Sequence, residues 1–481
     1  MTAIPSPSDS ANKVVTPHER ASEFLLGRIN YERITELPYG KRHMKLDRMR
    51  ELLTRLGNPD AGLPIVHVAG TKGKGSTSAM VAGILRNAGY ETGLFSSPHL
   101  ERIEERFVVN GVPCSSEELV ALVEQLRPIV EQMDREDATE GSLGTTYFDL
   151  TTAIALLLFA QRKVDIAVLE VGLGGRLDST NVCQPAITVI TSISLDHTKQ
   201  LGETVEEIAA EKAGIIKPGV PVLCGPLEPG PREVIAEIAR QHGSRMSEAG
   251  DDFHYTYHPP KDYEKHDRLG RLDFSGDLGS EDAELTGIPL RMLGEHQAEN
   301  AALAIAITAR LRKQGWSISS DAIRATFSKL VLPGRIELVR RHPAVVLDVA
   351  HNVAAVEALV DVITTSFTCK QRILILAATK DKDVRGIVRT LVPHFQRIIV
   401  SEYQINPRAV AAETLGGLVR EELSNLNLCE TVVAVEPQPI DAWHLAKNWT
   451  QSEGAESDNL ICITGSFFIA AELRHALLAN A

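Results

Sequence analysis

Residues 64 to 80 read Pro-Ile-Val-His-Val-Ala-Gly-Thr-Lys-Gly-Lys-Gly-Ser-Thr-Ser-Ala-Met, and they contain the side chains best suited to phosphate chemistry. An apolar run of strand type leads into a glycine-rich loop with two lysines, and small hydroxylated residues then begin a helix. Glycines let backbone N–H groups approach phosphate oxygens, and a helix N-terminus adds partial positive charge. Lys74 would supply a point charge and Ser76 a hydroxyl for Mg²⁺. The stretch therefore predicts a nucleoside triphosphate site.

The spacing of this loop differs from the common phosphate-loop pattern G-x-x-x-x-G-K-[ST]. Gly75 lies between Lys74 and the first hydroxyl, at Ser76. A glycine-rich connection between a strand and a helix can also be only a turn. The order of strand, glycines, lysine, hydroxyls and helix favours the phosphate-loop interpretation.

Further polar side chains follow other predicted strands: Ser97, Glu170, and Asp196 with His197. In parallel α/β sheets, ligands collect at the carboxyl ends of the strands. Mg²⁺ takes few protein ligands and keeps water and phosphate oxygens, so these groups together indicate a magnesium site. Taken singly, Glu170 could cap a helix and Ser97 a turn, and a lone histidine is more often structural than a ligand.

Further candidate residues lie later in the chain. Lys212 is on a helix that Thr204 and Glu207 begin as a capping box, and its residue type alone predicts a solvated surface lysine. Arg335 could neutralise phosphate charge from across a cleft. Pro333 to Glu337 and Asp348 to Asn352 could equally be a turn and a strand end.

Strands that alternate with helices predict an α/β protein with two doubly wound domains. We expect a disordered tail at residues 1–20, a first domain at 21–331 with a polar, β-rich insertion at about 243–291, and a smaller second domain at 332–481. Leu332-Pro-Gly would form the junction. A cleft between two such domains is a favoured place for a ligand.

Composition limits the functional classes and the cellular compartments that this protein fits. The net charge of −13 argues against a nucleic-acid-binding surface, which would need a basic face. The six cysteines are scattered without a C-x-x-C pair, which is typical of a reducing compartment. The first twenty residues lack the apolar core of a secretory signal, and no apolar run approaches the length of a membrane span. We expect a cytoplasmic protein that contacts neither membranes nor nucleic acid.

Ordered motifs along nearly the whole chain closely resemble those of the folylpolyglutamate synthase/dihydrofolate synthase family, a branch of the Mur ligases. The Glu170-Val-Gly-Leu-Gly-Gly-Arg-Leu-Asp178 block is specific to this branch. The other matching motifs are Gly70–Ser76, Ser96–Leu100, Thr146–Asp149, Leu195–Thr198, Glu211–Ile216, Gly294–Asn300, Leu332–Arg335 and Asp348–Asn352. The resemblance implies a P-loop NTPase-like Mur ligase central domain followed by a smaller Rossmann-like Mur ligase domain.

The resemblance also implies a role for each matching residue. Gly73, Lys74, Gly75 and Ser76 would bind the ATP phosphates, and Ser97, Glu170 and His197 would hold two Mg²⁺ or Mn²⁺ ions. Lys212 matches a lysine that the family carries as a metal-facing carbamate, which contradicts the surface role that its residue type predicts. Asn300 would contact adenine, Arg335 the phosphates and Asp348 the nucleotide. The pterin site would include Thr146, Tyr147, Phe148, Asp149, Leu177, Asp178 and Ser179.

The implied chemistry is ATP-driven amide formation by an acid–amino-acid ligase. A carboxylate of dihydropteroate or of a folate attacks the γ-phosphate of ATP, and the amine of L-glutamate then attacks the resulting acyl phosphate. Lys74, Arg335 and the metal ions would offset charge on the transferring phosphoryl group. His351 is a candidate for assisting at the acyl phosphate. The motifs match the bifunctional bacterial type, and family precedent favours a monomer.

This sequence departs from the family pattern at three positions. Lys72 replaces the usual Asn, Asp149 a common Glu, and Val353 the Pro that usually follows His-Asn. None of these changes removes a metal or phosphate group, but Asp149 lies in the pterin motif and bears on which folate form is preferred.

Two alternatives stay open at this point. One is a peptidoglycan-type Mur ligase that adds an amino acid to a UDP-sugar peptide, against which the block at 170–178 argues. The other is a P-loop nucleotide-binding switch, which predicts hydrolysis that does not depend on a carboxylate acceptor.

Overall fold

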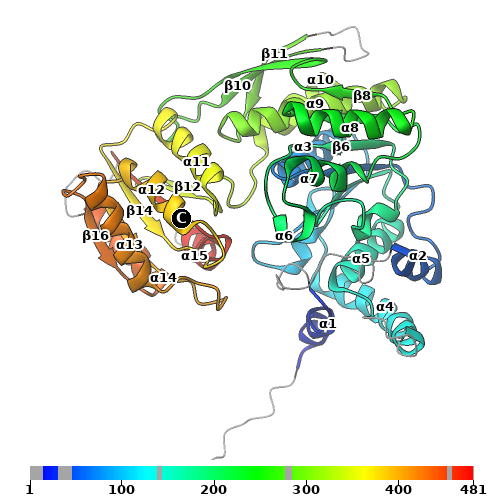
Figure 1. Ribbon diagram of the computed structural model, residues 1–481, viewed down its shortest axis with the longest axis horizontal. Coiled ribbons are helices and arrows are strands. Elements are labelled where there is room, and N and C mark those ends of the chain that lie inside the picture. Colours follow the sequence, from blue (N-terminus) through cyan, green and yellow to red (C-terminus); the bar gives the residue numbers. More distant parts are fainter. Residues whose placement is uncertain (1–14, 31–45, 138–143, 277–283, 452–457, 480–481) are drawn as a thin grey trace, which may run out of the picture.

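The computed structural model describes residues 15–30, 46–137, 144–276, 284–451 and 458–479. As the alternation of strands and helices predicts, these residues form two α/β domains, each built on its own largely parallel sheet (Figure 1). A third, antiparallel sheet extends the first domain.

The first domain is built on an eight-stranded sheet. Its strands are β1 (Ile65–Ala69), β2 (Thr92–Phe95), β3 (Phe107–Val109), β4 (Val112–Pro113), β5 (Ile166–Glu170), β6 (Ile187–Ile190), β7 (Val222–Cys224) and β8 (Met246–Glu248). Their order across the sheet is β4-β3-β2-β5-β1-β6-β7-β8. The β2–β3 and β3–β4 pairs are antiparallel, and all other pairs are parallel. β1 lies at the centre, so the loop after β1 opens at the middle of the carboxyl edge.

Both faces of this sheet are covered, so β1 and β5 are buried along their whole length and mostly apolar. Val66, Val68 and Val168 face a core shared with α3 (Lys74–Asn87), α9 (Glu295–Lys313) and α10 (Ser320–Lys329). Ile65 and Leu169 alternate with them and face the opposite layer. That layer consists of α1 (Pro17–Leu26), α2 (Leu46–Arg55), α4 (Ser116–Asp137) and α5 (Tyr147–Gln161). The helices that follow β6 and β7 in the chain are α6 (Thr198–Leu201), α7 (Val205–Ala213) and α8 (Pro229–Gln241).

The polar segment 243–291 contributes to two sheets. β8 closes one edge of the main sheet, whereas β9 (Phe253–His258), β10 (Gly270–Gly276) and β11 (Glu284–Leu290) form an antiparallel sheet in the order β11-β10-β9. Phe253, Leu272 and Ile288 bury the inner face of that sheet in the core of α3, α9 and α10. Alternating polar residues on the outer face explain why the segment is hydrophilic as a whole.

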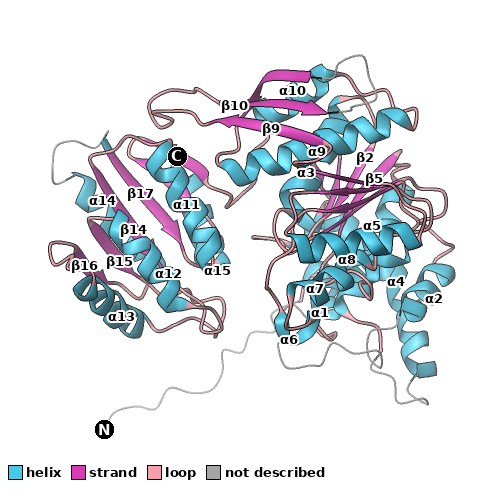
Figure 2. Cartoon of the chain, turned by 45° about the horizontal axis from the view of Figure 1, so that its top comes forward, coloured by secondary structure: helices cyan, strands magenta, loops and turns pink. Residues whose placement is uncertain are grey.

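The second domain has a six-stranded sheet. Its strands are β12 (Glu337–Arg341), β13 (Ala344–Leu347), β14 (Gln371–Leu376), β15 (Arg397–Val400), β16 (Val432–Val435) and β17 (Asn459–Thr464). The order is β12-β13-β17-β14-β15-β16, and only the β12–β13 pair is antiparallel. One face packs on α11 (Val353–Thr365), α12 (Val384–Leu391) and α13 (Ala412–Asn425), and the other on α14 (Pro439–Gln451) and α15 (Phe467–Ala479) (Figure 2).

The start of the chain differs from the prediction. Thr16 caps helix α1, which begins at Pro17, so the disordered tail predicted for residues 1–20 does not include residues 16–20. The capping box of Thr16 and Glu19 and the proline at the first helical position stabilise this start. Residues 1–14 lie outside the described part of the chain. Within the described residues, no helix has both the length and the apolar content that crossing a membrane requires.

Candidate active site

The loop between β1 and α3 forms the centre of the site. Helix α3 begins at Lys74 after Gly73, which has a left-handed φ of 82°. A Cβ at Gly73 would lie 2.3 Å from the side-chain oxygen of Asn300, so only glycine fits there. Ser76 is buried in the first turn, and the free N–H groups of that turn point out of the helix N-terminus. This local geometry suits a phosphate anion.

Two lysines converge on one backbone oxygen of this loop. The ammonium groups of Lys74 and Lys212 donate to the carbonyl oxygen of Gly70 at 3.0 and 2.9 Å, although Lys212 comes from α7. Lys212 is only 4% exposed, so the surface position that its residue type predicts is wrong. Burial and the neighbouring charge of Lys74 lower the pKa of Lys212 to about 7.

Glu170 lies beside the same loop, at the carboxyl end of β5. Its carboxylate accepts the backbone N–H of Ser97 at 3.2 Å, and a Cβ on Gly75 would be 3.4 Å from it. Burial raises the pKa of Glu170, while the charges of Lys74 and Arg335 and the N–H of Ser97 oppose that rise. A carboxylate buried against a phosphate loop is a suitable partner for a cation that also binds phosphate.

His197 completes the predicted metal group. It has a left-handed φ of 49° directly before α6, and burial lowers the pKa of its imidazole against the opposing effect of Asp196. The charges of Lys382, Lys74 and Lys212 also lower this pKa, so the imidazole, whose side chain is 54% exposed, lies within electrostatic range of all three lysines. No cluster of three or more His, Cys, Asp or Glu side chains suited to a metal occurs in the described residues. The predicted donor set of one carboxylate, one imidazole and one serine is smaller than such a cluster and would leave places on Mg²⁺ for phosphate and water.

Asn300 reaches the phosphate loop from α9. Its side-chain oxygen accepts from the Thr77 hydroxyl at 3.3 Å, and its amide donates to Gln297 at 3.2 Å. The side chain therefore lies at the edge of the loop, where a nucleotide bound by α3 would pass.

The linker between the domains carries Arg335, and Asp348 holds that linker in place. The two carboxylate oxygens of Asp348 accept the N–H groups of Ile336 and Ala350, both at 2.8 Å. Ile336 needs this support because it has a left-handed φ of 47°. Arg335 affects the pKa of Glu170, so its charge acts across the domain boundary on the site of the first domain.

His351 follows β13 on the second domain. Its Nδ1 lies 2.9 Å from the carbonyl oxygen of Val349, which can only accept, so Nδ1 carries the proton. Burial and the charges of Lys382 and Arg335 lower the pKa of His351, so the ring is neutral at pH 7 and Nε2 is a free acceptor.

The predicted pterin residues form one cluster at the start of α5. Asp149 accepts from the backbone and hydroxyl of Thr146 at 2.9 and 2.7 Å and from the Ser179 hydroxyl at 2.6 Å. Asp178 accepts from the N–H groups of Gly172 and Leu173, both at 3.0 Å, and burial raises its pKa to about 6. These carboxylates therefore hold the glycine-rich loop after β5 against α5.

The aromatic members of this cluster have different positions. The ring of Phe148 is so close to Gly172 that a Cβ there would lie 2.4 Å from it. Tyr147 is buried under the guanidinium of Arg106, 5.3 Å from the ring centroid. Leu177 is half-buried on the loop itself.

Two residues near the site, Arg106 and Lys382, were not predicted from the sequence. Arg106 is 1% exposed, donates to Nδ1 of His99 at 2.8 Å and influences the pKa of Glu170, but a single arginine in a loop gives no local signal. Lys382 influences the pKa of both His197 and His351, so it lies where the domains face each other. It follows β14, and the rule that sites form at the carboxyl ends of parallel strands would have indicated it.

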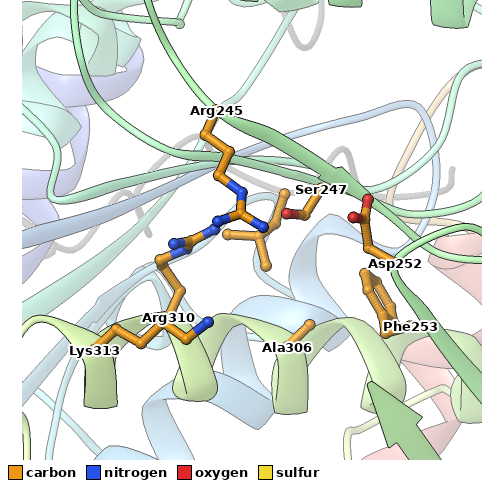
Figure 3. Close-up of a pocket in the computed structure, with 8 residues that line it drawn as sticks. Arg245, Ser247, Asp252, Phe253, Ala306, Arg310 and Lys313 are labelled. Carbon is orange, nitrogen blue, oxygen red and sulfur yellow. The ribbon is translucent and has the colours of Figure 1, made fainter. Parts of the chain in front are cut away.

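A separate pocket lies at the other end of α9. It is lined by Arg245, Ser247, Asp252, Phe253, Ala306, Arg310, Lys313 and Leu223 (Figure 3). At about 1.5 Å per residue, Arg310 is about 15 Å along the helix from Asn300. The pocket is therefore not part of the phosphate-loop site.

Comparison with known families assigns both domains. The Mur ligase middle domain matches residues 68–308, and the Mur ligase, glutamate ligase domain matches residues 334–467. Together with the two sheets and the phosphate loop, these matches define a Mur ligase. The predicted class of fold is confirmed.

Individual relatives narrow this class. The dihydrofolate synthase/folylpolyglutamate synthase of Bacillus subtilis is 37% identical over 90% of this chain and 94% of its own, and that of Escherichia coli is 31% identical over 90% and 92%. The chain belongs to the dihydrofolate synthase/folylpolyglutamate synthase family. Among solved structures, the folylpolyglutamate synthase of Mycobacterium tuberculosis with ADP and AMPPCP superposes with a TM-score of 0.82 at 30% identity, covering 96% of this chain and 98% of that one. Escherichia coli FolC with DHPP and ADP gives 0.75 at 30% identity, over 96% and 98%.

Proposed function

We propose that this protein is an ATP-dependent ligase that joins L-glutamate to a folate carboxylate. The observation that carries the proposal is the arrangement around Gly70. Two lysines and a helix N-terminus face the position of a triphosphate there, and the buried Glu170 lies beside it. Relatives named dihydrofolate synthase/folylpolyglutamate synthase have the same two domains over nearly their whole length, which supports the folate substrate.

The nucleotide would lie along α3 and the linker. Gly73, Lys74, Gly75 and Ser76 bind the phosphates, and Arg335 neutralises phosphate charge from the second domain. Asn300 contacts adenine from the edge of the loop. Asp348 acts on the nucleotide through the turn that it holds, because backbone N–H groups occupy both of its oxygens.

Ser97, Glu170 and His197 would hold two Mg²⁺ or Mn²⁺ ions between them and the phosphates. When bound, such ions polarise the γ-phosphate and neutralise its charge. Glu170 is the central ligand in this proposal, because a cation would stabilise the ionised form that burial disfavours.

Lys212 would act as a carbamate. A pKa of about 7 leaves much of the amine neutral under physiological conditions, and a neutral amine is the form that reacts with CO₂. Carbamate formation turns a buried cation that faces Lys74 into an anion that faces both Lys74 and the metal ions. Incorporation of ¹³C from labelled bicarbonate, present in the wild type and lost in Lys212→Arg, would test this assignment.

The reaction would proceed in two steps. A folate carboxylate oxygen attacks the γ-phosphorus of ATP, which releases ADP and leaves an acyl phosphate. The amine of glutamate then attacks the acyl carbon, and phosphate leaves from the tetrahedral intermediate. Lys74 and Arg335 offset the charge of the transferring group, and Nε2 of His351 can accept a proton near the acyl phosphate. The second domain excludes water that would hydrolyse the intermediate.

We propose both folate activities for this chain, the conversion of dihydropteroate to dihydrofolate and the extension of folate glutamate chains. Its pterin-site residues are Thr146 to Asp149 with Leu177, Asp178 and Ser179. A cytoplasmic monomer is the expected form.

A side-by-side assay tests the proposal. Purified protein is given ATP, Mg²⁺ and L-glutamate with dihydropteroate in one reaction and tetrahydrofolate in the other, and products are measured by mass spectrometry. Each product should gain one or more glutamyl units, and ADP release should depend on the acceptor. ADP release that neither acceptor stimulates would contradict the proposal and favour a nucleotide-binding switch.

A further inference from the structure

One arginine joins the two domains next to the site. Arg474 on α15 donates through Nε and Nη2 to the two carboxylate oxygens of Glu337, both at 3.0 Å, and through Nη1 to Glu101 at 2.9 Å. Glu337 belongs to the second domain, whereas Glu101 belongs to the loop after β2 in the first. The Arg474 side chain is 19% exposed, Glu101 29% and Glu337 8%, so water screens this group less than a surface ion pair.

On the side of the first domain, Glu101 ends a tightly held loop. The same loop carries Ser97, whose N–H binds Glu170. The carboxylate of Glu105 accepts the N–H groups of Leu100, Glu101 and Arg102 at 2.7, 3.0 and 2.7 Å. Leu100 packs against the core of the second domain. Glu101 thus belongs to a turn that is fixed to Glu105, and Ser97 lies in the same connection, shortly before this turn.

On the side of the second domain, Glu337 controls the linker. One of its oxygens accepts the N–H of Gly334 at 2.9 Å in addition to Nε of Arg474. Asp348 accepts the N–H of Ile336 at 2.8 Å. The residues directly before and after Arg335 are thus fixed, and the first of these two contacts belongs to the Arg474 group.

We propose that Arg474 is a positioning residue that couples the placement of the second domain to the alignment of Ser97 and Arg335. Its planar guanidinium binds both oxygens of Glu337 and is thereby held at a fixed angle to that carboxylate. Its Nη1 then donates to Glu101, so this hydrogen bond depends on the position of Glu101. Only when the domains meet at this angle do Glu170 and Arg335 approach the same phosphate. The inference rests on the proposed function and adds to it a residue that does not touch substrate.

Loss of this coupling should leave nucleotide binding by the first domain largely intact but let water reach the acyl phosphate. Water would then convert the acyl phosphate to the carboxylate and phosphate, and ATP would be consumed without amide formation. The informative measurement is therefore the amount of ADP released per glutamate ligated, together with kcat and the midpoint of thermal unfolding.

The variants are Glu101→Ala, Arg474→Lys and Arg474→Ala. Glu101→Ala removes the acceptor of the interdomain hydrogen bond and leaves the pairing of Arg474 with Glu337. Arg55→Ala is the matched control, because Arg55 also joins two glutamates, Glu51 and Glu136, but within the first domain. The wild type must first show ligation that depends on acceptor and glutamate, so failure of the proposed function appears as loss of that activity before any variant is compared.

We expect the variants at positions 101 and 474 to lower kcat about 10-fold, within the ~100-fold that a 1 Å misplacement can cost, and to raise the ADP-to-product ratio above that of the wild type. Arg474→Lys should resemble Arg474→Ala, since an ammonium group lacks the fork. Arg55→Ala should change neither quantity. A wild-type ratio and kcat in Glu101→Ala would overturn the proposal, and this variant provides the test if Arg474→Ala fails to fold.

Discussion

Two ammonium groups share the carbonyl oxygen of Gly70, and this is an unfavourable arrangement without an anion. Burial, and to a lesser degree the repulsion between Lys74 and Lys212, gives Lys212 its low pKa. A polyphosphate beside Lys74 and a carbamate on Lys212 would both relieve the repulsion. The carboxylate of Glu170 adds a negative charge to the site, and burial raises the pKa of this group. This arrangement supports the proposal that an anion and a cation bind here together.

Glu170→Gln tests the role of the buried carboxylate. The amide keeps the shape and can accept the N–H of Ser97, but it cannot neutralise a metal ion. We expect kcat with tetrahydrofolate to fall by about 100-fold or more, the scale of losing one electrostatic stabiliser, while the thermal unfolding midpoint stays within a few degrees of the wild type. Near-normal turnover in steady-state assays would contradict the metal assignment.

Lys212 should also make stability depend on pH. The unfolded chain holds this proton up to the ordinary pKa of 10.5, whereas the folded protein releases it near 7. Between pH 7 and 10.5 the unfolded state binds more protons, so raising the pH favours the folded state, by up to about 1.4 kcal/mol per pH unit.

Urea unfolding of the wild type and Lys212→Met in bicarbonate-free buffer measures this effect. The free energy of unfolding of the wild type relative to the variant should rise from pH 7 to 9. A constant difference would show that Lys212 is not held in a buried, neutral form.

At the scale of elements, the capping box of α5 belongs to the proposed pterin site. Thr146→Ala removes the cap and one partner of Asp149, so we expect a loss of about 1 kcal/mol in the free energy of unfolding and a raised KM for dihydropteroate with an unchanged KM for ATP. Thr16→Ala removes an equivalent capping box from α1, away from the site, and should cost similar stability without the change in KM. Equal KM values for dihydropteroate in both variants would contradict the assignment.

Local patterns predicted the elements that position the site. The apolar run before Gly70 and the Thr204 capping box each define their structure within a few residues. Strand β1 therefore ends, and helix α7 begins, where expected. The placement of candidate residues after strands followed from the rule for parallel sheets. Burial of Lys212 was invisible locally, because it depends on packing against Gly70 from 142 residues away. The contact of Arg106 with Tyr147 and those of Arg474 with Glu101 and Glu337 also join residues that are far apart in the sequence.

At the scale of the whole molecule, nucleotide binding should join the domains, because Arg335 and the phosphate loop lie on opposite sides of the boundary. Saturation with AMPPCP and Mg²⁺ at about 100 times Kd should add about 2.7 kcal/mol to the free energy of unfolding. Arg335→Ala should reduce the thermal shift at the same ligand concentration. A shift identical to that of the wild type in a thermal unfolding assay would place Arg335 outside the nucleotide site.

The central claim is that this molecule activates a folate carboxylate as an acyl phosphate. The most direct measurement uses tetrahydrofolyl-glutamate with ¹⁸O in the carboxylate that receives the next glutamate, together with ATP, Mg²⁺ and L-glutamate. Attack of that carboxylate on the γ-phosphorus predicts one ¹⁸O in each phosphate released and one retained in the new amide. Released phosphate without ¹⁸O, formed alongside ADP, would contradict the account.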